Sequence, residues 1–346
     1  MQKRLDVLKV IREWMLPIAM TAGAAAYLTY HYMPEPVHHA GPILSDIVAI
    51  VQPLMLFAML FLTFCRIEPR ELKPHRWHWP LLLIQGGLFV ALGALIVLLK
   101  SSLSMSRNWI VLIESAMLCF ICPTATAAAV VTRKLGGDVP GITTYTILIN
   151  ILVSVLVPMV VPMVHPSEGI DFWIAFSMIL AKVFPLLIMP CLAAWLVRYL
   201  LPDVHKWLVA KEDLPFQIWA VSLSLAIAVT VKAIVHSDLP MWLLCLIALV
   251  SLVCCALQFA MGHWVGSWYG RKRKHDRRIT AGQALGQKNT VFAIWMGYTF
   301  MSPESSIVGG FYSLWHNFYN SWQLHKNSLG HLRTRCSEEI SRMESL

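Results

Sequence analysis

The sequence predicts an all-α membrane protein of about ten transmembrane helices, arranged as an inverted five-helix repeat. Three observations support this prediction: charged residues are scarce, long apolar runs recur along the chain, and basic residues gather in alternate connections between the runs. Of the 346 residues, 57% are hydrophobic and 14% are charged, whereas a soluble domain carries about 25% charged residues. So few charges cannot cover a surface in water, which excludes an ordinary soluble globular domain.

Apolar runs of spanning length occur along the whole chain, since a transmembrane helix needs about 20 mostly apolar residues. The first run is too long for the apolar part of a cleavable signal peptide, so we interpret it as a first transmembrane helix. We therefore expect one integral membrane domain over residues 1–346, with a short cytoplasmic tail at 325–346. The runs lie near residues 13–33, 43–65, 79–99, 109–133, 140–165, 172–200, 214–235, 240–268, 279–300 and 303–324.

The basic residues predict the orientation of the chain. Of the 28 lysines and arginines, 23 lie in the N-terminal segment, in alternate connections and in the C-terminal tail. Only Lys100 and Arg107 lie in the opposite set of connections, and Lys182, Lys232 and Lys288 lie within runs. Because cytoplasmic loops are enriched in basic residues, this asymmetry places both termini in the cytoplasm and favours an even number of spans.

A proline interrupts the run at 109–133. Pro123 lies near the middle of this run, and proline removes one backbone donor and clashes with the preceding helical turn. Thr124 and Thr126 stand next to the break and can serve the backbone carbonyls that it releases. Taken alone, this pattern is equally typical of a kinked structural helix.

The run at 279–300 contains a second interruption. Gly286 is followed by Gln287, Lys288 and Asn289, a set that no lipid-facing helix would carry. Irregular backbone at this depth is tolerated only where it is packed in protein or lines a cavity. The interrupted runs are the fourth and the ninth, and helices five steps apart run in opposite directions. The pair therefore predicts an inverted repeat whose discontinuous helices cross at a binding site near mid-membrane.

Two charged residues lie inside the predicted spans. Lys288 is roughly 13 Å from the cytoplasmic end of its run at 1.5 Å per residue, where a charge costs about 2.5–3.5 kcal/mol. A structural lysine held by the carbonyls of the broken helix is the alternative interpretation. Glu114 lies near the outer end of the fourth run, where we expect it to carry a proton or to form an ion pair with Lys288 or Lys182.

The order and spacing of several motifs resemble the bile acid:sodium symporter family. The resemblance implies ten helices, with a panel of helices 1, 2, 6 and 7, a core of helices 3–5 and 8–10, and discontinuous helices 4 and 9 that cross. It also implies transport of organic anions such as bile acids, pantoate or pyruvate, usually with two sodium ions. The motifs are Pro53-Leu54, Gln85, the run CPTATAAAVVT followed by Gly137-Asp138, the run ALGQKN, and Trp315-His316-Asn317.

The sodium ligands that the resemblance implies are missing from this sequence. Ala128 and Ala129 stand where the family has a Ser-Asn pair, and Ala284 stands where it has a glutamate. Lys288 occupies the place of a glutamine. Because methyl groups offer no oxygen to a cation, we expect no metal site and no cofactor. The residues expected at the substrate or ion site are Gln85, Glu114, Thr124, Thr126, Thr132, Thr146, Gln287, Lys288 and Asn289, with helix breaks at Pro123 and Gly286.

The sequence therefore predicts a secondary transporter of a small organic anion in the cell (inner) membrane, working by alternating access. We expect transport to be independent of sodium, with the Lys288 ammonium in place of a sodium ion. The alternative is a sodium-coupled organic anion symporter with altered ion ligands. An enzyme is not expected, because no nucleophile, carboxylate pair or set of metal ligands recurs at one depth. The expected partners are the organic anion and the lipid bilayer, not nucleic acid.

Overall fold

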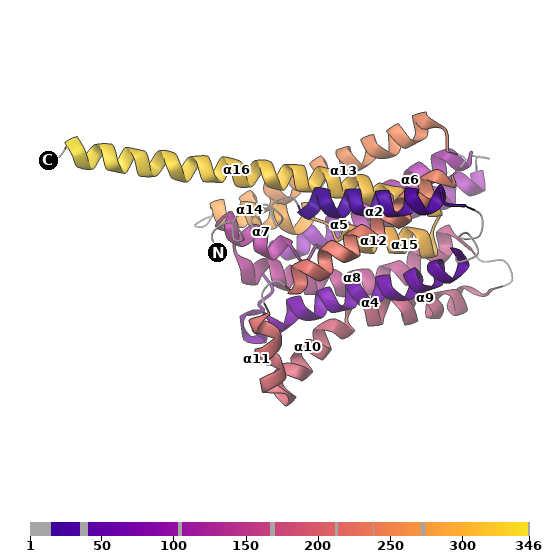
Figure 1. Ribbon diagram of the computed structural model, residues 1–346, viewed down its shortest axis with the longest axis horizontal. Coiled ribbons are helices and arrows are strands. Elements are labelled where there is room, and N and C mark those ends of the chain that lie inside the picture. The colour runs from indigo at the N-terminus through magenta and orange to yellow at the C-terminus, as the bar shows by residue number, and fades with distance from the viewer. Residues whose placement is uncertain are drawn as a thin grey trace.

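A computed structural model of the chain describes residues 15–34, 41–102, 106–166, 170–211, 214–237, 239–270 and 274–344. Within these ranges the secondary structure consists of α-helices, two short 3-10 turns and one isolated β-bridge, so the prediction of an all-α protein is confirmed. The helices lie side by side in one bundle, and the C-terminal helix α16 projects beyond it (Figure 1).

Each predicted apolar run coincides with one helix or with a consecutive pair of helices. Two of the pairs are the interrupted fourth and ninth runs, and a third interruption divides the sixth run at Ile188. The helices are α2 (Met15–His31), α4 (Gly41–Cys65), α5 (His78–Ser102), α6 (Arg107–Ile121), α7 (Ala128–Lys134), α8 (Val139–Val164), α9 (Phe172–Leu187), α10 (Met189–Leu200), α11 (Pro202–Ala210), α12 (Leu214–Val235), α13 (Met241–Tyr269), α14 (Lys274–Gly286), α15 (Thr290–Phe300) and α16 (Ile307–Glu344), with 3-10 turns at Pro69–Glu71 and Pro303–Ser306.

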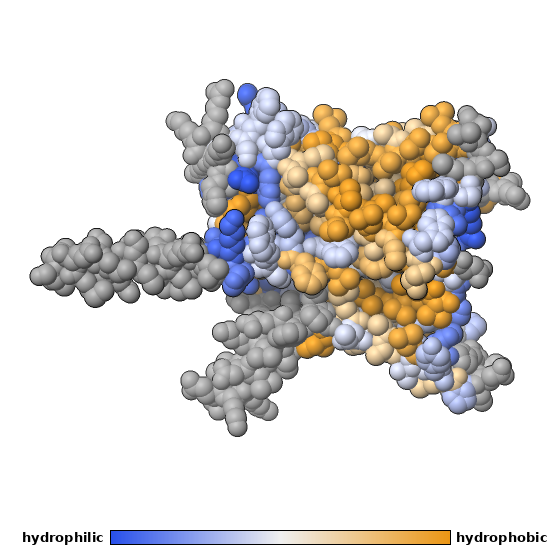
Figure 2. All heavy atoms as spheres, turned by 90° about the horizontal axis from the view of Figure 1, so that it is seen from above, coloured by the Kyte–Doolittle hydropathy of each residue, from blue (hydrophilic) through white to orange (hydrophobic). Residues whose placement is uncertain are grey.

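Six segments are long and apolar enough to cross a membrane, and α15 is a shorter apolar helix. Apolar residues cover the middle of the bundle and hydrophilic residues gather at its two ends (Figure 2). This distribution is that of a multi-pass membrane protein, because only the middle of such a bundle faces hydrocarbon. The six segments are Gly41–Cys65, His78–Ser101, Val139–Val164, Phe172–Leu200, Gln217–Val235 and Met241–Tyr269.

Two features differ from a simple reading of the apolar runs. Helix α16 does not end with the last run but continues without a break to Glu344, so most of the expected tail is helical. The short helix α11 connects the sixth and seventh runs, and it was not predicted because it is not part of an apolar run. The basic residues at the start of the chain, Lys3 to Arg12, lie outside the described residues.

Glycines allow α13 and α14 to approach closely. A methyl group at Gly262 or Gly266 of α13 would overlap the α14 backbone at Ala281 or Arg277. Gly282 of α14 lies in the same way beneath the ring of His263. Small residues spaced four apart on facing helices are a common device of membrane helix packing, because they let the two backbones meet. This contact holds α14, and with it the second interruption, in a fixed place.

Candidate functional site

The two interruptions meet at one place inside the bundle. Helix α6 ends at Ile121 and α7 begins at Ala128, while α14 ends at Gly286 and α15 begins at Thr290. The two non-helical linkers pair as an isolated antiparallel bridge between Thr124 and Lys288. Two segments more than 160 positions apart in the sequence therefore cross with their backbones in contact.

Each linker satisfies backbone groups that the other leaves without a helical partner. The Asn289 N–H donates to the Pro123 carbonyl at 2.8 Å, and the Ala125 N–H donates to the Gln287 carbonyl at 2.9 Å. The Thr124 hydroxyl donates to the Ala284 carbonyl at 2.7 Å. Buried backbone groups require such partners, so the crossing is stable only when both breaks are present.

Side chains of surrounding helices complete the capping of α6. Gln85 of α5 donates from Nε2 to the Cys122 carbonyl at 2.9 Å, and the Tyr145 hydroxyl of α8 donates to Gln85 Oε1 at 2.9 Å. Gln258 of α13 donates to the Cys119 carbonyl at 3.1 Å. Sequence reasoning placed Gln85 at the site but missed Tyr145 and Gln258, whose only signal is that a polar group lies within a strongly apolar run.

The end of α14 is capped by a residue from α16. The Tyr312 hydroxyl donates to the Gly286 carbonyl at 2.8 Å and accepts from Gln258 Nε2 at 3.1 Å. Tyr312 was also missed by sequence reasoning. Together with Gln258 it links the two breaks through a second path, outside the linkers themselves.

Lys288 is fully enclosed at the crossing, with 1% of its surface exposed. Within the described part of the chain its Nζ has no hydrogen-bond partner. The thiols of Cys119, Cys122 and Cys255 lie close enough to interact with its charge. The ion pair with Glu114 that the sequence left open does not form, and a buried ammonium without an acceptor is a costly arrangement.

Other predicted residues have unsatisfied polar atoms, Gln287 and Asn289 at the crossing and Thr132 farther along α7, beside Gly137. Gln287 Oε1, Asn289 Nδ2 and Thr132 Oγ1 are buried and make no hydrogen bond with a described residue. The side-chain oxygen of Asn289, by contrast, caps α15 by accepting from the Phe292 N–H at 3.3 Å. Buried polar atoms are normally paired, so Gln287 and Asn289 mark a place at the crossing where a ligand or water can complete the hydrogen bonds.

The remaining residues predicted for the site make fewer contacts with the crossing of the two linkers. Thr126 lies half-buried in the first linker, and Thr146 donates to the Ile142 carbonyl of its own helix at 2.9 Å. Ala128 and Ala284 are completely buried, with Ala284 joined to the crossing through Thr124, while Ala129 is half-buried. Ala128 and Ala284 therefore turn methyl groups toward protein, and none of the three alanines supplies a side-chain oxygen.

Glu114 lies apart from the crossing, in an ion pair that sequence reasoning did not foresee. It is seven residues before the end of α6, about 10 Å along the helix. Its Oε1 is 2.8 Å from His165 Nε2 at the end of α8, and its Oε2 accepts from the Ser302 N–H at 3.3 Å. Glu114 thus ties α6 to two connections at this end of the bundle. Lys182, the other candidate partner, instead lies over the ring of Phe300 at 5.6 Å.

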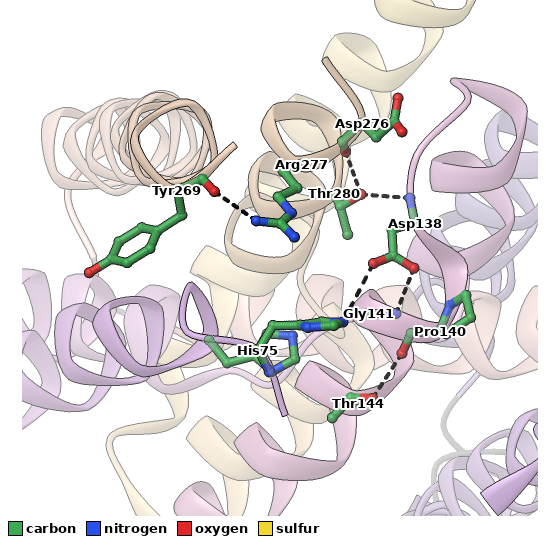
Figure 3. A network of polar contacts seen from close by, with 10 residues as sticks. His75, Asp138, Pro140, Gly141, Thr144, Tyr269, Asp276, Arg277 and Thr280 are labelled. Carbon is green, nitrogen blue, oxygen red and sulfur yellow. Dashed lines mark hydrogen bonds and ion pairs between the residues drawn. The ribbon is translucent and has the colours of Figure 1, made fainter. Parts of the chain in front are cut away.

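A second polar network secures the start of α14 at the opposite end (Figure 3). The Asp138 N–H donates to the Thr280 hydroxyl at 2.8 Å, and that hydroxyl donates to the Asp276 carbonyl at 2.6 Å. Asp138 also accepts from the Gly141 N–H at 3.1 Å and lies 3.8 Å from His75. The turn between α7 and α8 is therefore attached to α14, so the helices on either side of the two breaks are joined beyond the crossing as well.

Two interrupted helices that cross inside an apolar helical bundle form the architecture of secondary transporters. The fold and the crossing define this chain as a membrane transporter. The sequence model of the SBF-like CPA transporter family matches residues 15–324, and the chain belongs to this family. The expected kinship with the bile acid:sodium symporters, and the expectation of transport rather than catalysis, are thereby confirmed. Among curated proteins, none matches the chain in sequence.

Proposed function

We propose that the chain carries a small organic anion across the membrane by alternating access, without sodium. The observation that supports this proposal is the buried ammonium of Lys288, which has no acceptor among the described residues. A buried charge is retained in a membrane protein chiefly where a ligand or an ion pathway uses it. A carboxylate would supply both the opposite charge and the missing hydrogen-bond acceptor.

The local backbone favours an anion as well. Helix α15 begins at Thr290, directly after Lys288 and Asn289, and a helix N-terminus carries a partial positive charge. The unpaired Nδ2 of Asn289 adds a neutral donor beside it. Ammonium, amide and helix terminus together form a set of donors that matches a carboxylate and does not match a cation.

In this proposal the Lys288 ammonium takes the place of a sodium ion. Released carbonyls at broken helices are the usual ligands of transported cations, and here a fixed positive charge can stabilise them. Ala128, Ala129 and Ala284 remove side-chain oxygens that a bound sodium ion would need. The proposed carrier is therefore an exchanger, a facilitator or a proton-coupled transporter.

A sodium-coupled symporter with altered ligands is the second candidate. It is favoured by Thr132 Oγ1 and Gln287 Oε1, two buried side-chain oxygens without a hydrogen-bond partner in the described structure. Oxygen atoms of this kind are what a hard cation binds. Sodium dependence of uptake distinguishes this candidate from the first.

We further propose ten spans in an inverted repeat, with a panel of helices 1, 2, 6 and 7 that moves against a core of helices 3–5 and 8–10. Support comes from the ten apolar runs, each of which lies on a helix or helix pair, and from the antiparallel pairing of the two linkers at Thr124 and Lys288. Helices α7, α11 and α14 bring their basic residues to one end of the bundle (Figure 1). This end is proposed to face the cytoplasm of the inner membrane.

Uptake into proteoliposomes tests the proposal. The full chain is reconstituted, and the uptake of labelled pyruvate, pantoate and a bile acid is measured with sodium and again with choline in its place. We expect at least one anion to enter at the same rate in both media. Uptake that rises tenfold or more with sodium, a factor worth about 1.4 kcal/mol of coupling, would support the second candidate instead.

Substitution of Lys288 shows whether its ammonium is responsible for sodium-independent uptake. Lys288→Gln keeps a polar side chain but removes the charge, so we expect uptake to be lost or to become dependent on sodium. Lys206→Gln is the matched control, because Lys206 is an exposed cation on α11 far from the crossing in sequence. Unchanged uptake by Lys288→Gln, or no uptake of any organic anion by the folded wild-type chain, contradicts the proposal.

A further inference from the structure

A groove of about 540 Å³ lies on the surface between α13 and α16, next to the start of α14. Its inner wall adjoins the crossing, because Phe259 of the lining packs against Gly286, but the proposed transport does not use the groove itself. The face that holds α13 and α16 is the upper one in Figure 1, and it is the face seen in Figure 2. Apolar residues cover the middle of this face, so a groove here opens toward the hydrocarbon of the membrane.

The walls of the groove are aromatic. Phe259 and Trp264 of α13 and Trp315 and Tyr319 of α16 line it. The ring centroids of Phe259 and Tyr319 are 4.2 Å apart, so these two rings are in contact and join the two helices beneath the opening. Trp264 is 61% exposed, so its ring stands out from the bundle and deepens the groove. An elongated apolar surface of aromatic rings fits a flexible apolar chain that lies over it.

One end of the groove is polar and positively charged. Arg278 of α14 lies there, beside His263 and Ser267 of α13. The guanidinium is exposed and makes no ion pair with any described carboxylate. Arg277, its neighbour in the chain, is by contrast occupied, because it donates to the Tyr269 carbonyl at 2.7 Å.

We propose that this groove binds one anionic phospholipid. The phosphate lies against Arg278, with the Ser267 hydroxyl and the His263 ring alongside, and an acyl chain follows the aromatic walls toward Trp315. Two observations select a lipid as the occupant. The groove runs along α13, which is apolar enough to span the membrane, and its charged end is the end that carries the basic residues of α14. Basic side chains at the end of a span are where anionic headgroups bind.

Native mass spectrometry of the purified full chain tests this proposal. The protein is mixed with phosphatidylglycerol or with phosphatidylcholine of the same acyl chains, and the lipids retained after detergent removal are counted. We expect one phosphatidylglycerol to be retained in preference to phosphatidylcholine. Arg278→Ala should lower this retention about fivefold, the factor that one basic side chain near an anionic lipid surface provides. Ala256→Trp, which fills the groove from its exposed wall, should abolish it.

Matched controls separate the groove from the rest of the surface. Arg277→Ala removes a neighbouring cation outside the groove, and Leu257→Trp adds the same bulk to an exposed position of α13 that does not line it. The matched feature of Leu257→Trp is the tryptophan introduced on the exposed surface of α13, and both controls should retain lipid as the wild type does. The proposal is overturned if Arg278→Ala and Ala256→Trp retain as much phosphatidylglycerol as the wild type. It is also overturned if the wild type shows no preference for the anionic lipid. A lipid-free dimer that Ala256→Trp dissociates would overturn it as well, because the groove would then be filled by a second copy of the chain.

Discussion

Lys288 and Glu114 are both buried charges, but they stand in opposite situations. Glu114 has 0% exposure and is compensated by His165, whereas Lys288 has 1% exposure and no partner among the described residues. Glu114 and His165 form a pair that joins α6 to α8, whereas Lys288 is available to bind a ligand. At the scale of single residues, this difference separates a structural charge from a charge that is proposed to act in transport.

Removal of His165 should destabilise the protein more than neutralisation of Glu114. His165→Ala leaves a fully buried carboxylate without its partner, and the removal of one partner of a buried pair costs about 3–5 kcal/mol. Glu114→Gln leaves the ring of His165, whose side chain is 29% exposed and can be reached by water, so its cost should be smaller. Equilibrium unfolding in mixed micelles measures the free energy of unfolding of both variants and shows which one is less stable. If Glu114→Gln proves the more destabilising, the ion pair does not have the structural role described above.

At the scale of helices, the contact between α13 and α14 positions the second break. Facing glycines bring the two backbones together, and the network of Asp138 and Thr280 holds the same end of α14. Helix α14 has only 13 residues, and most of its contacts with other helices are with α13. Its position therefore depends on this close approach and on the caps at its two ends.

Gly266→Ala should weaken this contact. A methyl group there overlaps the α14 backbone at Arg277 and Arg278, which cannot rotate away, and overpacking of this kind costs about 1–3 kcal/mol. Gly87→Ala on α5 is the matched control, because a methyl group at Gly87 meets no atom within 4 Å. That control should be neutral or slightly stabilising, since alanine is the better helix former. Thermal unfolding of the two variants compares them, and an equal effect would show that α13 and α14 can separate at no cost.

The sequence predicts the helices well because each depends on a local property. Apolar runs and the helix-breaking residues Pro123 and Gly286 are visible in the chain itself, and helices end at Ile121 and Gly286. The partners of the breaks are not visible, because Tyr145 and Tyr312 are brought to the crossing only by tertiary packing. The extension of α16 was also missed, since its last turns carry no apolar run and hydropathy alone gives no reason to continue the helix.

At the scale of the whole molecule, the bundle has two unlike ends. One carries Glu114 with His165, and beside them Arg107 is paired with Glu304 at 2.6 Å. The other carries the start of α14, the end of α7 and helix α11, with their basic residues (Figure 1). The enrichment of basic residues at a single end is the signal by which membrane proteins are oriented.

Site-directed labelling should reveal this orientation. In a background that lacks Cys245 and Cys336, a membrane-impermeant maleimide should label Trp173→Cys in intact cells. Lys206→Cys should react only after the cells are permeabilised. Both positions are exposed, one at the start of α9 and the other on α11, so reactivity reports sidedness and not burial. Labelling of Lys206→Cys in intact cells would reverse the proposed orientation.

The reciprocal hydrogen bonds of the crossing also constrain how such a molecule can be divided. If the chain is cut between α8 and α9, each piece keeps one interruption but loses the amide and carbonyl that complete it. Unsatisfied backbone groups inside hydrocarbon cost several kcal/mol each, so neither fragment is stable alone at that depth. The two pieces must find each other before either is properly inserted, which makes their association a condition of maturation and not an event that follows it.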